Sequence, residues 1–189
     1  MRASVSRFIL RLCGWRLEGA KPDADRAVCL AVPHTSNWDF IWMLLAGWGL
    51  GVSFHWLGKH TLFKAPFGGI MRALGGVPVN RSAPQDLVSQ VAERLREGAP
   101  LLLVIPPEGT RRRADNWKSG FYYIARQAQV PVVPTYLDYK ARRTGIAPQL
   151  PTGLTKREMM DALREFYASM GGKFPERMSP IRLDNEDDD

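Results

Sequence analysis

Cysteine is scarce in this sequence, with only Cys13 and Cys29 among 189 residues. They lie in segments of different character and form neither a CxxC pair nor a spacing typical of zinc ligands. We therefore expect no disulfide framework and no metal site. Sparing use of cysteine is typical of a reducing compartment.

Long apolar runs are also missing. The uncharged run from Phe40 to Phe54 has fifteen residues, including three glycines, whereas a bilayer-spanning helix needs about 20 apolar residues. Arginines interrupt the first seventeen residues, so the continuous apolar core of a signal peptide is absent. We expect neither a signal peptide nor a full transmembrane span.

Acidic residues are few outside the last six positions. Residues 184–189 carry five acids and no base, which leaves 14 acids against 26 bases in residues 1–183, a net charge of +12. The positive charge of residues 1–183 suggests an anionic partner: nucleic acid, a phospholipid surface, a phosphorylated substrate or an acidic carrier protein. We expect the acidic tail, 184–189, to be disordered.

Residues 1–17 have the pattern of an amphipathic helix. Their apolar members recur at helical spacing while the arginines lie largely elsewhere on the helix: Val5, Phe8, Ile9, Leu12 and Trp15. Basic and aromatic residues together suit a helix on an anionic membrane, and a helix packed on the domain with a solvated basic face is the alternative. We predict a membrane-facing helix, in a protein peripheral or monotopic at the cytoplasmic face.

Strands and helices are predicted to alternate along the rest of the chain. Apolar runs indicate strands at 27–32, 53–57, 77–79, 101–105 and 132–137. Helical patterns indicate one helix starting at Ser36 and others at 67–74, 87–95, 117–127 and 155–170, the last opening with a capping box, Thr155 and Glu158. This order predicts one α/β domain over residues 1–183, with a largely parallel central sheet flanked by helices and function at the strand ends.

The stretch PHTSNWDF follows the first of these apolar strands. Ser36 and Asp39 have the spacing of a capping box. If the helix starts at Ser36, His34 lies on the loop before it and Asp39 in its first turn, where the carboxylate can orient the imidazole. His34 is therefore either a hydrogen-bonded histidine beside a helix cap or a general base.

Two further stretches contain candidate binding residues. PPEGTRRR follows the strongest strand, and it combines a turn-forming Gly109, the Thr110 hydroxyl and Arg111, which can grip a phosphate. A surface turn with solvated arginines is the alternative. In GGVPVNR, Arg81 follows a short strand and is weak evidence by itself.

Taken together, these stretches resemble the glycerolipid (lysophospholipid) acyltransferase family, which includes bacterial 1-acylglycerol-3-phosphate acyltransferases. The family's histidine, four residues and aspartate match His34 and Asp39, and its proline followed by EGTR matches 107–111. Its glycine with an arginine five residues later matches Gly76 and Arg81, and its two spaced prolines match 131–134. The resemblance covers 28–135, more than half of the chain.

The resemblance implies transfer of a fatty acyl group from a thioester, acyl-CoA or acyl carrier protein, to the hydroxyl of a lysophospholipid on an anionic membrane surface. It implies no bound cofactor. No RNA-binding signature is matched, and the six tryptophans are spread through apolar segments, so we expect no nucleic-acid partner. The resemblance assigns catalysis to two residues, His34 and Asp39, and acceptor binding to five: Arg81, Glu108, Gly109, Thr110 and Arg111. The alternatives are acyl transfer to another lysolipid, such as a lyso-ornithine lipid, or a non-enzymatic basic module that binds membranes.

Overall fold

The fold is built on one mostly parallel sheet. The structure is a computed structural model that describes residues 1–79 and 84–186. In those residues the sheet has seven strands in the order β1-β7-β6-β2-β5-β3-β4, and only the β6–β7 pair is antiparallel. The strands are β1 (Arg16–Gly19), β2 (Arg26–Val32), β3 (Phe54–Lys59), β4 (Gly76–Val79), β5 (Leu101–Ile105), β6 (Val132–Asp138) and β7 (Arg143–Ile146). The predicted α/β class with a largely parallel sheet is confirmed.

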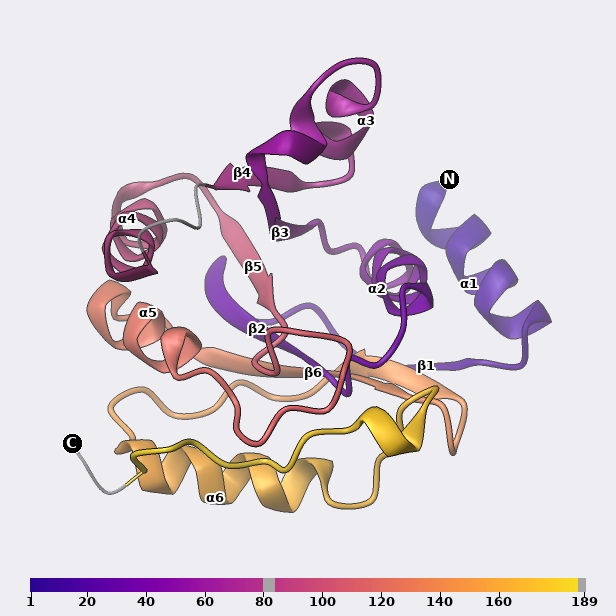
Figure 1. Cartoon of the computed structure of the whole chain (residues 1–189). Coiled ribbons are helices and arrows are strands. Elements are labelled where there is room, and N and C mark those ends of the chain that lie inside the picture. The colour runs from indigo at the N-terminus through magenta and orange to yellow at the C-terminus, as the bar shows by residue number, and fades with distance from the viewer. Residues whose placement is uncertain (80–83, 187–189) are drawn as a thin grey trace.

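Helices cover both faces of the sheet (Figure 1). One face packs on α4 (Pro84–Glu97), α5 (Gly120–Ala128) and α6 (Lys156–Tyr167), and the other packs on α2 (Trp38–Gly49) with α1 (Arg2–Leu12) beside it. The short helices η1 (His60–Phe63) and α3 (Gly68–Ala73) lie beyond β3 and the edge strand β4. A short helix η2 (Pro175–Arg177) follows α6.

Strand β2 shows why the sheet is buried on both faces. Val28 and Leu30 point into the core below α4, α5 and α6, while Ala27 and Cys29 point into the core beneath α2. Successive side chains of a strand face opposite sides, so an unbroken apolar run requires cover on both. This places the carboxyl end of β2, and hence His34, at the centre of the fold.

Strands β1 and β7 were not predicted, whereas the predicted cap of α6 is confirmed. Strands β1 and β7 are short and carry no apolar alternation, and β7 forms as the return arm of a hairpin from β6. At α6 both capping-box bonds are present: Glu158 N–H donates to Thr155 Oγ1 at 3.3 Å, and Thr155 N–H donates to Glu158 Oε2 at 2.9 Å. The helix ends at Tyr167, earlier than predicted.

The predicted helix over residues 1–17 is too long. Helix α1 ends at Leu12 because Gly14 adopts a left-handed φ of +74°, and the N–H of Trp15 then donates to Leu10 O at 2.8 Å. Trp15 turns into the core, 7% exposed, rather than toward a membrane. Among the described residues, the helices all fall short of the length and apolar character needed to cross a bilayer.

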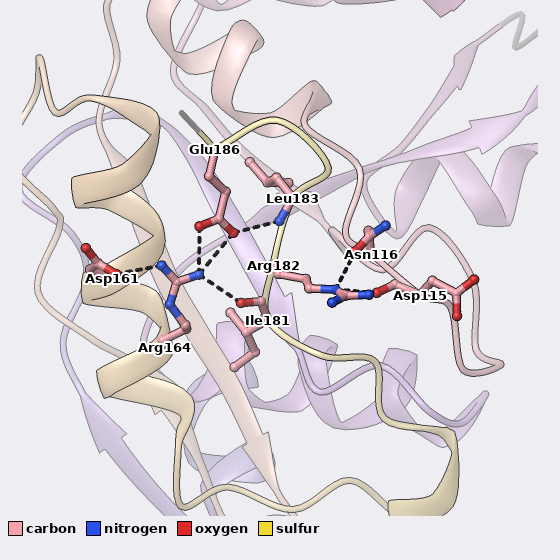
Figure 2. Close-up of polar contacts among 8 residues, drawn as sticks. All are labelled: Asp115, Asn116, Asp161, Arg164, Ile181, Arg182, Leu183 and Glu186. Atoms are coloured by element: carbon pink, nitrogen blue, oxygen red, sulfur yellow. Dashed lines mark hydrogen bonds and ion pairs between the residues drawn. The ribbon is translucent and has the colours of Figure 1, made fainter. Parts of the chain in front are cut away.

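Glu186, in the stretch expected to be disordered, contacts α6 (Figure 2). Residues 184–186 form a turn, in which Glu186 accepts hydrogen bonds from Arg164 at 3.0 Å and from Leu183 N–H at 2.8 Å. An arginine on α6 thus provides a partner for this carboxylate, and the disorder expected of residues 184–189 stays a prediction. Residues 187–189 lie outside the described part.

Candidate functional site

A cavity of about 770 Å³ lies where β2, β3 and β5 end. Its polar lining includes His34, Asp39, Lys59, Thr110, Arg111 and Lys118. Its apolar lining includes Phe40, Met43, Trp56, Leu57, Leu87 and Val104. The volume is in the range of small-molecule sites, about 300–1,000 Å³, and the mixed lining suits an amphipathic molecule with an anionic head and an apolar chain.

His34 and Asp39 meet in this cavity. His34 follows β2 by two residues, Asp39 lies in the first turn of α2, and His34 Nδ1 is 3.2 Å from Asp39 Oδ2. The His34 side chain is 19% exposed and lines the cavity. A carboxylate at Nδ1 fixes the imidazole tautomer and leaves Nε2 to accept a proton.

Asp39 is held by the loop that precedes its helix. Its Oδ2 accepts hydrogen bonds from the N–H groups of Thr35 and Ser36, both at 2.9 Å, and its Oδ1 accepts one from the Tyr139 hydroxyl at 2.7 Å. These three donors offset the cost of burying a carboxylate that is only 3% exposed. Helix α2 begins at Trp38 rather than at Ser36 as predicted, since Ser36 stays in the loop and its Oγ accepts from Trp38 N–H at 3.2 Å.

Glu108 lies behind His34 and not on the cavity wall. Its side chain is 2% exposed, and its Oε1 accepts a hydrogen bond from the backbone N–H of His34 at 2.8 Å. Burial raises the pKa of this carboxyl, although the bond from His34 and contacts with Ser179 act in the opposite direction. The structure thus brings Glu108 to the backbone of the candidate base, whereas the resemblance assigned it to the acceptor.

The next three residues of the loop line the cavity. Gly109 has a φ of +68°, a conformation that side chains disfavour, and its N–H donates to Pro106 O at 3.0 Å. This turn carries the chain from the buried Glu108 to the exposed Thr110 and Arg111. Arg81, the remaining candidate, lies outside the described residues.

The C-terminal segment supports the same loop. Ala114 N–H donates to Ser179 Oγ at 3.0 Å, and Trp117 N–H donates to the carbonyl of Arg182 at 2.8 Å. The Arg182 guanidinium donates to Asp115 O and, at 2.6 Å, to Asn116 Oδ1 (Figure 2). The cavity-lining loop is therefore tied at several points to a segment that no sequence motif singled out.

Comparison with known proteins agrees with this geometry. A family model described as Acyltransferase matches residues 16–138, which contain every described candidate residue. The chain belongs to the Acyltransferase family. The match covers more than half of the chain, and it includes the loops with His34 and Glu108 and the strands that precede them.

Two individual proteins resemble this member of the family. The chain is 28% identical over 141 residues to a 1-acyl-sn-glycerol-3-phosphate acyltransferase of Streptococcus pneumoniae. The aligned residues are 74% of this chain and 49% of that protein. The chain thus spans about half the length of this curated relative. The crystal structure of PlsC, a 1-acyl-sn-glycerophosphate acyltransferase of Thermotoga maritima, superposes with a TM-score of 0.58 at 19% identity, over 87% of this chain and 73% of PlsC. That likeness confirms the fold.

Tyr139 is the residue that sequence reasoning missed. It directly follows β6, a position where functional side chains of parallel sheets gather. That position is the signal that could have identified it, because neither its spacing from other motifs nor its type is distinctive.

Proposed function

We propose that this protein transfers a fatty acyl group from an acyl thioester to the free hydroxyl of a lysophospholipid, and that 1-acylglycerol-3-phosphate is the acceptor and phosphatidate the product. One observation carries the proposal: His34 Nδ1 lies 3.2 Å from Asp39 Oδ2 in a cavity that Arg111 and a set of apolar side chains also line. A base, a cation for a phosphate and room for an acyl chain are the three parts that the reaction needs.

In the proposed reaction His34 Nε2 accepts the proton of the acceptor hydroxyl as its oxygen attacks the thioester carbonyl. Asp39 stabilises the imidazolium that forms. The tetrahedral intermediate then collapses, the carbon–sulfur bond breaks, and the thiolate takes the proton from His34. No acyl-enzyme is needed, and the donor is the thioester of coenzyme A or of an acyl carrier protein.

The negative oxygen of the intermediate needs hydrogen-bond donors. The N–H groups of Thr35 and Ser36 already donate to Asp39, and that of Gly109 donates to Pro106. We therefore assign the oxyanion donors to the segment carrying Thr110 and Arg111, which lines the same cavity.

A membrane surface is the proposed source of the acceptor. Large apolar side chains are exposed on α1, at the start of α2 and around α3: Val5, Phe8, Leu12, Trp38, Ile41, Leu62, Phe67 and Ile70. Helix α1 also exposes Arg2, Arg7 and Arg11, and such cations suit an anionic bilayer. In this proposal the apolar surface lies against the membrane.

The test is product analysis with purified protein. Labelled acyl-CoA and acyl carrier protein thioesters are incubated with a panel of lysolipids that includes lysophosphatidate and a lyso-ornithine lipid. We expect phosphatidate as the main product, and a loss of about 10²- to 10⁴-fold in rate for His34→Ala. Exposed His60 lies outside the cavity lining, so His60→Ala is the matched control and should keep the wild-type rate.

Two outcomes would contradict the proposal. Transfer by folded His34→Ala at the wild-type rate would exclude the proposed base. Failure of wild-type protein to acylate any hydroxyl acceptor would favour a basic membrane-binding module, whose salt-sensitive binding survives the loss of His34.

A further inference from the structure

Tyr139 comes from a distant part of the chain to contact the candidate catalytic pair His34 and Asp39, called the dyad below. Its hydroxyl donates to Asp39 Oδ1 at 2.7 Å, across 100 residues of sequence. The family match ends at residue 138, one position earlier. Nothing in the motifs explains this contact.

The surroundings of Tyr139 hold its hydroxyl in place. Its backbone N–H donates to Gly171 O at 2.8 Å, and its ring meets Trp15 edge to face, with 5.0 Å between centroids and an interplanar angle of 83°. Burial, followed by the bond to Asp39 and the charge of Asp39, raises the pKa of the phenol well above its ordinary value. At neutral pH the phenol therefore keeps its proton and donates it to Asp39.

The two oxygens of Asp39 have different partners. Oδ2 faces His34 and two backbone N–H groups, while Oδ1 has Tyr139 as its hydrogen-bond partner among residues 1–79 and 84–186. A single donor on Oδ1 fixes the plane of the carboxylate and draws part of its negative charge away from the imidazole.

We propose that Tyr139 is a positioning residue: its hydrogen bond orients Asp39 toward His34 Nδ1 and sets the basicity of His34. The role rests on the proposed acyl transfer, since it acts through the proposed base. Other charged groups around the dyad are Glu108, at the backbone of His34, and the cavity-lining Lys59, Arg111 and Lys118. All four remain in place when only the Tyr139 hydroxyl is removed.

Tyr139→Phe tests the role, with Tyr136→Phe as the matched control. Tyr136 lies on β6, and its hydroxyl also donates to a carboxylate at 2.7 Å, but to Glu18 instead of Asp39. Each variant loses one hydroxyl and keeps its ring. The measurements are kcat and the pH profile of kcat/KM with acyl-CoA and lysophosphatidate, together with an NMR titration of His34. The chain has three histidines, and the His34 resonance is assigned by its loss in His34→Asn.

We expect Tyr139→Phe to lower kcat about ten-fold, the size of one charge-assisted hydrogen bond. Without the phenol the carboxylate interacts more strongly with the imidazolium, so His34 should titrate at higher pH, and the acidic limb of the profile should move the same way. Tyr136→Phe should leave both readouts at wild-type values.

An unchanged His34 titration in Tyr139→Phe, or an equal change in both variants, would overturn the inference. The titration needs no turnover, so it decides the role of Tyr139 even if wild-type protein acylates no lysolipid, a result that would refute only the proposed function. Conversely, active Tyr139→Phe protein with wild-type kcat and pH profile would leave the proposed function standing and refute the role of Tyr139.

Discussion

Asp39 has two separable tasks in this structure, and two substitutions distinguish them. The carboxylate faces His34, and it also accepts the N–H groups of Thr35 and Ser36, each at 2.9 Å. An asparagine can keep its carbonyl oxygen on those two N–H groups and turn its amide toward Tyr139, whose hydroxyl can rotate to accept. It loses only the charge. An alanine removes the acceptor altogether.

The expected magnitudes follow from these contacts. In Asp39→Ala the N–H groups of buried Thr35 and Ser36 lose their partner, at about 1–3 kcal/mol each. Water in the adjacent cavity reduces that cost, so we expect about 3 kcal/mol, or a Tm lower by roughly 6–12 °C for a chain of this size. Asp39→Asn should stay within about 1 kcal/mol of wild type, while both variants should lose about 10²-fold or more in kcat/KM.

Thermal unfolding and steady-state acyl transfer on the same preparations provide the test. Asp161 on α6 is 65% exposed and pairs with Arg164, so Asp161→Ala is the surface control and should change the stability by less than about 1 kcal/mol. If Asp39→Ala had the same Tm as Asp39→Asn, the structural task of the carboxylate would be refuted. An Asp39→Asn enzyme with wild-type kcat/KM would refute the need for its charge.

Two further predictions concern buried ionisable groups. Burial raises the pKa of Glu108, so the folded protein holds this proton more tightly than the unfolded chain, and stability falls as pH rises from the unfolded value through the folded value. Glu108→Gln keeps an acceptor for His34 N–H, so its Tm should rise relative to wild type as the pH is raised above the ordinary pKa of the carboxyl; a Tm difference that stays constant with pH in paired melts would contradict this. Cys29 is fully buried with a pKa raised to about 12, whereas Cys13 is exposed, so a thiol reagent should modify one cysteine in native protein and both in denaturant. Modification of both in the native state would show that the β2 core opens.

Elements with a strong local pattern were predicted well. Strand β5 spans Leu101–Ile105, as its apolar run predicts, and the α6 cap at Thr155 has the bonds of its sequence pattern. Both sequence patterns consist of residues within a few positions of one another. By contrast, β7 has little apolar pattern in its RTGI sequence, and it exists because β6 and β1 supply ladders on either side.

The sequence by itself determined the local chemistry of this protein: the loop with His34 and Asp39 after one buried strand, and the Gly109 turn with Arg111 after another. Strand order then decided which distant groups join them. Because β6 and β5 flank β2, the residues that follow these strands, Tyr139 and Glu108, reach Asp39 and the His34 backbone. Such contacts depend on sheet topology and packing, which no pattern within one segment specifies.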